Sequence, residues 1–193
     1  MEKGLVVILS GASSVGKQGI RDRLKADPEL QLHYSVSITT RPPKAGEVDG
    51  GDYYFVTFKN FAEAVKNHEL VEYTEFNCYY YGTPKAHLDF LLEQGKNVLI
   101  EVEAQGVGPL KLNYPDALAF FVMPRSLEDL EQQINTVYGD HDASAKNRLN
   151  KAKMDMEIAG LFRNVVSNDN TELAVSQIKE KILQELENRK GGK

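Results

Sequence analysis

The feature that most constrains the fold is a Gly-x4-Gly-Lys motif at residues 11–17, which directly follows a short apolar run. The run Leu5 to Leu9 is continuously apolar, as is typical of a strand buried on both faces of a parallel sheet. Apolar residues then recur at helical spacing at Ile20 and Leu24. A strand, a glycine-rich turn and a helix in this order predict a loop whose backbone N–H groups surround a phosphate, with Lys17 reaching the terminal phosphates.

The end of this loop departs from the common pattern. The residue after the lysine is usually Ser or Thr, whose hydroxyl ligates Mg²⁺. Here Gln18 and Gly19 follow instead, and neither has a hydroxyl group. Ser13 and Ser14 lie within the loop, but no sequence feature assigns them to the missing ligand. The phosphate cradle is therefore predicted to be intact, whereas Mg²⁺ placement is predicted to be compromised.

Strand and helix patterns alternate along the second half of the chain. The expected strands are Asn97 to Ile100, Ala117 to Val122 and Asn164 to Ser167, and the expected helices are Ser126 to Ile134, Ala145 to Phe162 and Asn170 to Leu186. Such alternation predicts an α/β fold, a doubly wound parallel sheet with helices on both faces. Ligands on these sheets bind at the carboxyl ends of the strands.

The segment between the phosphate loop and the second half of the chain shows a different pattern. Ser35 to Phe55 is rich in Thr, Tyr, Gly and Pro without helical periodicity, which predicts a small β-lobe. Apolar residues at helical spacing from Phe58 to Val65 predict a short amphipathic helix. Thr83 and Pro84 are expected as the N-cap and first residue of a further helix.

Composition excludes several classes of protein. The chain has 193 residues, a net charge of −5 and a pI near 5.5, which disfavours a general nucleic-acid binder. The single cysteine, Cys78, has no internal disulfide partner, and the four histidines lack zinc-ligand spacing. The apolar start is too short to span a membrane and has no signal cleavage site, so a cytoplasmic protein is expected.

Three further segments carry a family resemblance. Residues 35–55, Ser-Val-Ser-Ile-Thr-Thr-Arg-Pro-Pro-Lys-Ala-Gly-Glu-Val-Asp-Gly-Gly-Asp-Tyr-Tyr-Phe, closely resemble the GMP-binding segment of guanylate kinases. Leu-Val-Glu-Tyr at 70–73 with Tyr-Tyr-Gly-Thr-Pro at 80–84, and Val-Leu-Ile-Glu-Val-Glu-Ala-Gln-Gly at 98–106, follow in family order. The resemblance runs from about Leu5 to Asn168. It implies one domain (1–190) with a P-loop NTPase-type core (1–34 and 96–190), a GMP-binding lobe (35–95) and a lid (126–148).

The resemblance also implies roles for individual side chains. The positions expected to bind the GMP phosphate are Arg41, Lys44, Tyr53 and Tyr81. At the position of Lys44 the family usually has a second arginine. The positions expected to recognise guanine are Ser37, Glu72, Thr83 and Glu103. The residues expected to bind ATP are Gly11, Ser13, Ser14, Gly16, Lys17, Gln18 and Asn168. Glu101 is expected in the substrate site and is the candidate carboxylate near Mg²⁺, although no motif predicts a direct metal site.

The lid sequence is unusual for such an enzyme. No Lys or Arg lies between Ser126 and Ala145, and Gln133 and Val137 stand where the family usually places arginines. The acids of this stretch are Glu128, Asp129, Glu131, Asp140 and Asp142. Only Arg148 remains. Because lid arginines neutralise the migrating phosphoryl group, slow transfer is predicted.

The leading hypothesis is an ATP:GMP phosphotransferase of purine nucleotide metabolism, with Lys17, Arg41 and Arg148 as its catalytic residues. Its expected partners are GMP and ATP, with Mg²⁺ and without nucleic acid or membrane, in a monomer or homodimer. The alternative is a non-catalytic guanine-nucleotide-binding or protein-interaction module that keeps the kinase fold. A kinase for another monophosphate is disfavoured by Glu72, Thr83 and Glu103.

Overall fold

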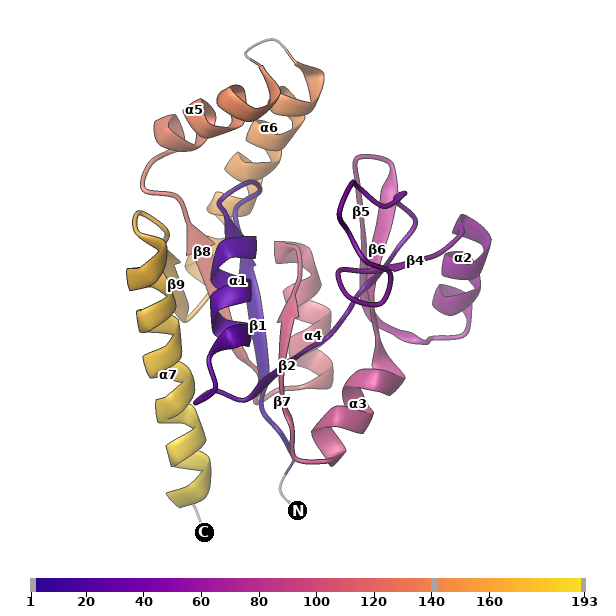
Figure 1. The fold of residues 1–193 in the computed structure, drawn as a ribbon, viewed down its shortest axis with the longest axis vertical. Coiled ribbons are helices and arrows are strands. Elements are labelled where there is room, and N and C mark those ends of the chain that lie inside the picture. Colours follow the sequence, from indigo (N-terminus) through magenta and orange to yellow (C-terminus); the bar gives the residue numbers. More distant parts are fainter. Residues whose placement is uncertain (1–2, 140–141, 192–193) are drawn as a thin grey trace.

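A computed structural model describes residues 3–139 and 142–191 (Figure 1). The core is a five-stranded sheet in the order β2-β7-β1-β8-β9, with every neighbouring pair parallel. Its strands are β1 (Val6–Gly11), β2 (Leu32–Tyr34), β7 (Asn97–Glu101), β8 (Leu118–Met123) and β9 (Asn164–Ser167). The expected parallel α/β fold is therefore confirmed.

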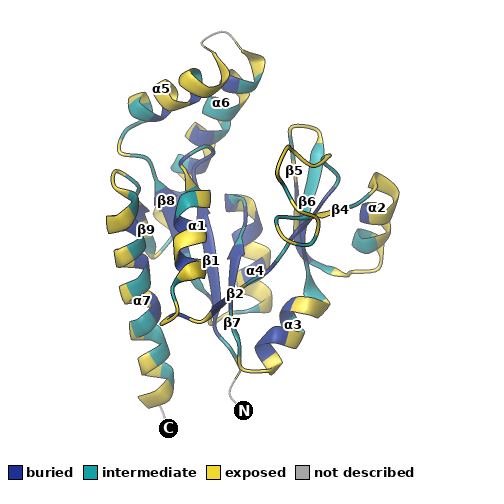
Figure 2. Cartoon of the chain, in the orientation of Figure 1, coloured by how far each residue is buried: buried dark blue, intermediate teal, exposed yellow. Residues whose placement is uncertain are grey.

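Helices cover both faces of this sheet because alternate residues of β1 point in opposite directions. Leu5, Val7 and Leu9 belong to the apolar cluster that includes residues of α1 (Lys17–Ala26) and α7 (Thr171–Gly191). Val6 and Ile8 belong to the cluster that includes residues of α3 (Lys85–Glu93) and α4 (Val107–Asn113). The central strands are buried, while the outer sides of the helices are exposed (Figure 2).

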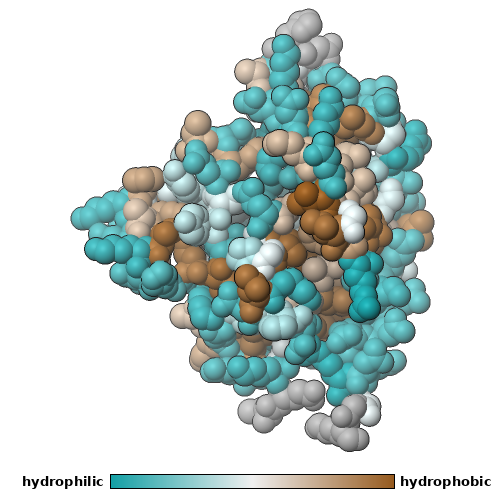
Figure 3. All heavy atoms as spheres, turned by 180° about the vertical axis from the view of Figure 1, so that it is seen from behind, coloured by the Kyte–Doolittle hydropathy of each residue, from teal (hydrophilic) through white to brown (hydrophobic). Residues whose placement is uncertain are grey.

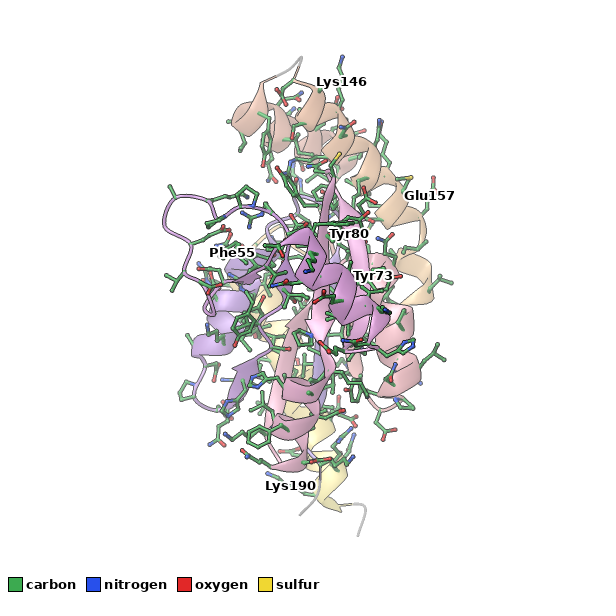
Figure 4. The ribbon with its side chains drawn as sticks, turned by 90° about the vertical axis from the view of Figure 1, so that its right-hand side faces the viewer. Phe55, Tyr73, Tyr80, Lys146, Glu157 and Lys190 are labelled. Carbon is green, nitrogen blue, oxygen red and sulfur yellow. The ribbon has the colours of Figure 1, made fainter. Side chains whose placement is uncertain are left out.

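A smaller sheet in the order β4-β3-β6-β5 forms a lobe beside the core (Figure 1). Its strands are β3 (Ile38–Thr39), β4 (Tyr54–Phe55), β5 (Leu70–Phe76) and β6 (Tyr79–Pro84). The helix α2 (Phe58–Lys66) packs on this sheet through the buried side chain of Phe61. The centre of the Phe61 ring lies 5.5 Å from the centre of the Tyr80 ring. Of the expected apolar stripe, Phe58 is 63% exposed. Phe55, Tyr73 and Tyr80 of the lobe are labelled in Figure 4.

Two helices stand above the carboxyl ends of the core strands: α5 (Leu127–Tyr138) and α6 (Ala143–Glu157) (Figure 1). The N-cap of α5 is Ser126, whose hydroxyl oxygen accepts a hydrogen bond from the Asp129 N–H. Asp140, one of the expected lid acids, lies outside the described residues. The short 3₁₀ helices η1 (Ala104–Gly106) and η2 (Ala159–Leu161) complete the elements.

The expectation for Thr83 and Pro84 was wrong. The strand β6 continues through Pro84, which is itself the N-cap of α3 and has extended backbone angles. The Thr83 hydroxyl donates to the Glu72 carboxylate instead of capping the helix. The α3 helix, which lies within the expected lobe range 35–95, packs with Leu88, Leu91 and Leu92 against the core sheet.

Other differences concern element lengths. The expected helix from Ala145 to Phe162 ends at Glu157, and η2 follows it. The last helix continues beyond Leu186 as far as Gly191. The strand β2 and the helix α4 were not expected at all.

A hollow of about 790 Å³ lies on the core away from the phosphate loop, lined by residues of α4, β8, η2 and α7. Apolar side chains gather near the middle of the reverse face (Figure 3). Among the exposed apolar residues are Leu112 and Leu161, each 84% exposed. Within the described ranges, no helix combines the length and apolarity needed to cross a membrane.

We expect Gly11→Ala to lower the free energy of unfolding by at least about 2 kcal/mol, measured by urea denaturation. Gly11 has a φ of +154°. A Cβ added there would lie 2.4 Å from the carbonyl oxygen of Val122 and 2.8 Å from the backbone nitrogen of Val122. These are backbone atoms of a central strand and have no room to move. Gly108→Ala in α4 is the matched control, because nothing lies within 4 Å of its added Cβ. Equal stability of Gly11→Ala and the unmodified chain would contradict this packing.

Candidate functional site

Two cavities adjoin at the carboxyl ends of β1 and β7. The small cavity, of about 230 Å³, lies between the core and the lobe. The large cavity, of about 1020 Å³, lies between the phosphate loop and α5. The residues that line both are Lys17, Gln18, Lys44, Glu101 and Arg148. A ligand in one cavity therefore lies against the same charged groups as a ligand in the other.

The phosphate loop, residues 11–17, leads from β1 into α1. Its turn requires left-handed backbone angles at Ser14 (φ 66°) and at Gly16 (φ 86°). The Lys17 ammonium donates to the carbonyl oxygens of Gly11 and Ala12, both at 3.1 Å. This lysine therefore folds over the mouth of the loop, beside the N-terminus of α1, where helix geometry favours anions.

The expected ATP-binding residues divide into two groups. Those that line the large cavity are Ser14, Gly16, Lys17, Gln18 and Asn168. Gly11 and Ser13 do not line it; Ser13 is buried, and its backbone N–H donates to Asp155 at 3.1 Å. The Asn168 side chain donates to the Val15 carbonyl at 2.8 Å, which fixes the loop from the β9 side.

The end of the small cavity holds a buried acid. Glu72, on β5, is 6% exposed, and the Thr83 hydroxyl donates to its Oε1 at 2.5 Å. Burial raises the pKa of Glu72 to about 7, against the opposing effect of Thr83. Its Oε2 lies so close to Gly106 that a Cβ there would be 2.6 Å away. Ser37 and Glu103 line the same cavity, whereas Thr83 lies behind Glu72 and does not.

The other end of the small cavity holds an arginine and two tyrosines. Arg41 makes two hydrogen bonds of 2.8 Å to the carboxylate of Glu47. Its guanidinium lies 5.4 Å from the ring centre of Tyr53, which is 5.8 Å from that of Tyr81. Burial raises the pKa of both phenols, so they are hydroxyl donors at neutral pH. Lys44 lies beside them, at the junction with the large cavity.

Glu101 ends β7 between the cavities, and its carboxylate pairs with an arginine that the motifs did not indicate. The Nη1 of Arg21 lies 3.3 Å from Glu101 Oε2, and the guanidinium lies 5.2 Å from the centre of the Tyr34 ring. Burial raises the pKa of Glu101, while Lys17 and Arg21 oppose this shift. Arg21 follows Lys17 by four residues, so both side chains lie on the same face of α1. This spacing could have indicated Arg21 as a residue of the site.

The lid brings one cation to the junction of the cavities. Arg148 lies with its guanidinium 4.6 Å from the ring centre of Tyr138 and 5.5 Å from that of Phe76. Within the part of the chain that the structure describes, its buried Nε has no hydrogen-bond partner. Gln133 and Val137 line the large cavity, as their sequence positions suggested.

Other lid cations are less well placed. Arg125 lines the large cavity but pairs with Asp129 at 2.6 Å. Lys146 is exposed and points away at the outer end of α6 (Figure 4). A further cation on α6 was missed: Lys151 lies 2.9 Å from Glu103 and 3.0 Å from Asp155. Only its i, i+4 spacing from Asp155 was visible in the sequence.

The described residues include no group of three or more His, Cys, Asp or Glu side chains arranged to hold a metal ion. Gln18, which has an amide oxygen, and Glu101, which has a carboxylate, both line the two cavities beside the phosphate loop. Mg²⁺ commonly takes only one or two protein ligands and completes its shell with phosphate oxygens and water. This donor set fits a metal that arrives with a nucleotide and does not form a dedicated cage.

Comparison with known proteins identifies the family. The family model described as guanylate kinase matches residues 3–185. A guanylate kinase of Mesoplasma florum is 40% identical over 183 residues, which are 95% of this chain and 62% of that protein, so this chain spans less than two thirds of it. A guanylate kinase of Bacillus subtilis is 38% identical over 184 residues, which are 95% of this chain and 90% of that protein.

A solved structure agrees in fold. The crystal structure of guanylate kinase from Anaplasma phagocytophilum matches with a TM-score of 0.77 and 24% identity, covering 96% of this chain and 87% of that one. With a family model matching nearly the whole sequence and relatives near 40% identity, this chain belongs to the guanylate kinase family.

Proposed function

We propose that this protein transfers the γ-phosphoryl group of ATP to GMP and produces ADP and GDP. The observation that carries this proposal is the pair of adjoining cavities with Lys17, Glu101 and Arg148 shared between them. Two phosphate-bearing ligands, one in each cavity, would meet end to end at these groups. The names of the relatives support the same activity.

The small cavity suits GMP. Guanine presents two neighbouring donors, its N1–H and its 2-amino group, and the cavity offers the carboxylates of Glu72 and Glu103 with the hydroxyl of Ser37. Adenine lacks these donors and would leave a buried acid unpaired, which costs far more than a lost contact. At the other end, Arg41, Lys44 and the donors Tyr53 and Tyr81 suit the phosphate of GMP.

The large cavity suits ATP with its Mg²⁺. The phosphate loop and the N-terminus of α1 would hold the β- and γ-phosphates, with Lys17 exchanging its two carbonyl acceptors for phosphate oxygens. Gln18 and Glu101 would hold Mg²⁺, which would neutralise charge on the ATP phosphates. Asn168 would hold the loop in shape through Val15.

The reaction requires little covalent chemistry from the protein. An oxygen of the GMP phosphate attacks the γ-phosphorus of ATP, and the bond from that phosphorus to the β–γ bridging oxygen breaks, leaving ADP. Lys17 and Arg148 would stabilise the charge on the migrating group, and Arg41 would hold the acceptor phosphate in line. Closure of lobe and lid would exclude water, which would otherwise accept the phosphoryl group.

The rival proposal is a non-catalytic module that keeps the guanine pocket. It is favoured by the absence of a hydroxyl after Lys17 and by the neutral Gln133 and Val137 in the large cavity. A steady-state assay with GMP and ATP–Mg²⁺ separates the two, since a module would bind GMP without forming GDP.

GMP affinity is expected to rise with pH and to level off above about 7, measured by calorimetric titration from pH 5.5 to 8.5. Glu72, with its pKa near 7, must lose its proton to accept from guanine, so each pH unit below 7 should cost up to about tenfold in affinity. The GMP phosphate also titrates, near pH 6. Glu72→Gln is the control: it should bind at least about tenfold more weakly at pH 8 and retain only the phosphate's dependence. A pH profile identical in both proteins would contradict the role of Glu72.

The double variant Gln133→Arg, Val137→Arg is expected to raise kcat about tenfold or more while changing the KM for GMP little. Both positions line the large cavity, so arginines there would act on the migrating phosphoryl group. Glu131→Arg places an arginine on the same helix outside the cavity and should leave kcat nearly unchanged. If the unmodified protein already turns over as fast as the Bacillus subtilis relative, slow transfer is refuted.

A further inference from the structure

One lysine joins the two halves of the site without lining either cavity. Lys151 lies on α6 with its side chain 15% exposed. Its Nζ lies 2.9 Å from Glu103 Oε2 and 3.0 Å from Asp155 Oδ1. Glu103 lines the small cavity and lies two residues after the end of β7.

The second acid connects this lysine to the phosphate loop. Asp155 is 5% exposed, and its other oxygen accepts the backbone N–H of Ser13 at 3.1 Å. The path therefore runs from Glu103 through Lys151 and Asp155 to the backbone of the loop. Each link is 3.1 Å or shorter and involves at least one charged side chain.

The surroundings of Glu103 show why a cation is needed there. The negative charge of Glu103 contributes to the raised pKa of three neighbouring acids, which are Glu72 on β5, Glu101 on β7 and Asp155 on α6. It also contributes to the raised pKa of the Tyr81 phenol. Neighbouring carboxylates disfavour each other's ionised forms. Burial alone would lower the pKa of Lys151, but Glu103 and Asp155 raise it above its ordinary value, so the lysine stays charged.

We propose that Lys151 is a positioning residue for guanine recognition, holding the Glu103 carboxylate in its orientation and tying it through Asp155 to the phosphate loop. This inference rests on the proposed function. It differs from the role of Arg148, which lies in both cavities, because Lys151 acts only through Glu103 and Asp155. The helix α6 would thereby contribute to the selection of the acceptor through Lys151 as well as to transfer through Arg148.

The test is GMP binding by calorimetry in the full chain without ATP, at pH 7.5. Lys151→Met keeps the aliphatic stem and removes the charge, and it should weaken GMP binding at least about tenfold at pH 7.5. A purely structural role would weaken binding to the same extent when glutamine stands at position 103, whereas a role that acts through Glu103 would not.

Three variants complete the design. Lys151→Arg should bind within about threefold of the unmodified chain, because it restores the charge. Lys153→Met removes an exposed lysine of the same helix and should change nothing. In a Glu103→Gln background, Lys151→Met should cost less than about twofold, since the two effects are coupled.

The inference is overturned if Lys151→Met binds GMP within twofold of the unmodified chain, or if Lys151→Met costs as much affinity in the Glu103→Gln background as it does alone. If Lys151→Met does not fold, Lys151→Gln carries the same measurement. Failure of the proposed function has a different signature, because the unmodified chain would then bind GMP no better than AMP.

Discussion

The close approach of Gly11 to Val122 is the constraint on which the rest of the structure depends. Gly11 lies opposite Val122 in the β1–β8 ladder, and the next N–H, that of Ala12, donates to the Val122 carbonyl at 3.0 Å. Without a side chain at this point, β1 turns directly into the loop while it is still bound to its neighbour. The loop, α1 and Lys17 therefore take their positions from the centre of the sheet, the most deeply buried part of the core.

The same arrangement decides where the acids lie. The strand β7 pairs with the other side of β1, with Glu101 in register with Leu9, so its end brings Glu101 and then Glu103 beside the loop. Glu72 arrives from a separate sheet, by way of the lobe, and approaches through the space left by Gly106. Two unconnected sheets thus supply neighbouring carboxylates, and the cations between them come from α1 and the lid.

Sequence patterns predicted the elements whose signals are local. The strand β9 was placed at its observed bounds, and the phosphate loop was recognised because its glycines, lysine and flanking elements are contiguous. The strand β2 was missed because only Leu32 of its three residues is buried, which leaves no periodicity to detect. The helix α4 was missed because Gly108 and Pro109 in its first turn are typical of a loop.

Much of the candidate site was indicated by motif resemblance, and the residues outside the motifs show the limit of that approach. Asp155 contacts Ser13 across 142 positions, and Arg21 contacts Glu101 across 80. No periodicity or spacing encodes such pairs, because they depend on how the helices cross the ends of the strands. The wrong prediction of Thr83 as an N-cap has the same origin. A local rule assigns its hydroxyl to the start of the helix, but the hydroxyl donates to the carboxylate of Glu72 on the neighbouring strand.

The pairing of Arg41 with Glu47 has a consequence for ligand exchange. A carboxylate resembles one edge of a phosphate, and Glu47 already occupies both arms of the guanidinium fork. Under the proposed function, the GMP phosphate would take the place of Glu47, and Glu47 would return to the guanidinium when the phosphate leaves. Arg41 would then never be left as an unpaired buried cation, so neither binding nor release would carry the full cost of exposing it. The affinity at Arg41 would be a difference between two similar anions, which favours reversible binding over tight retention.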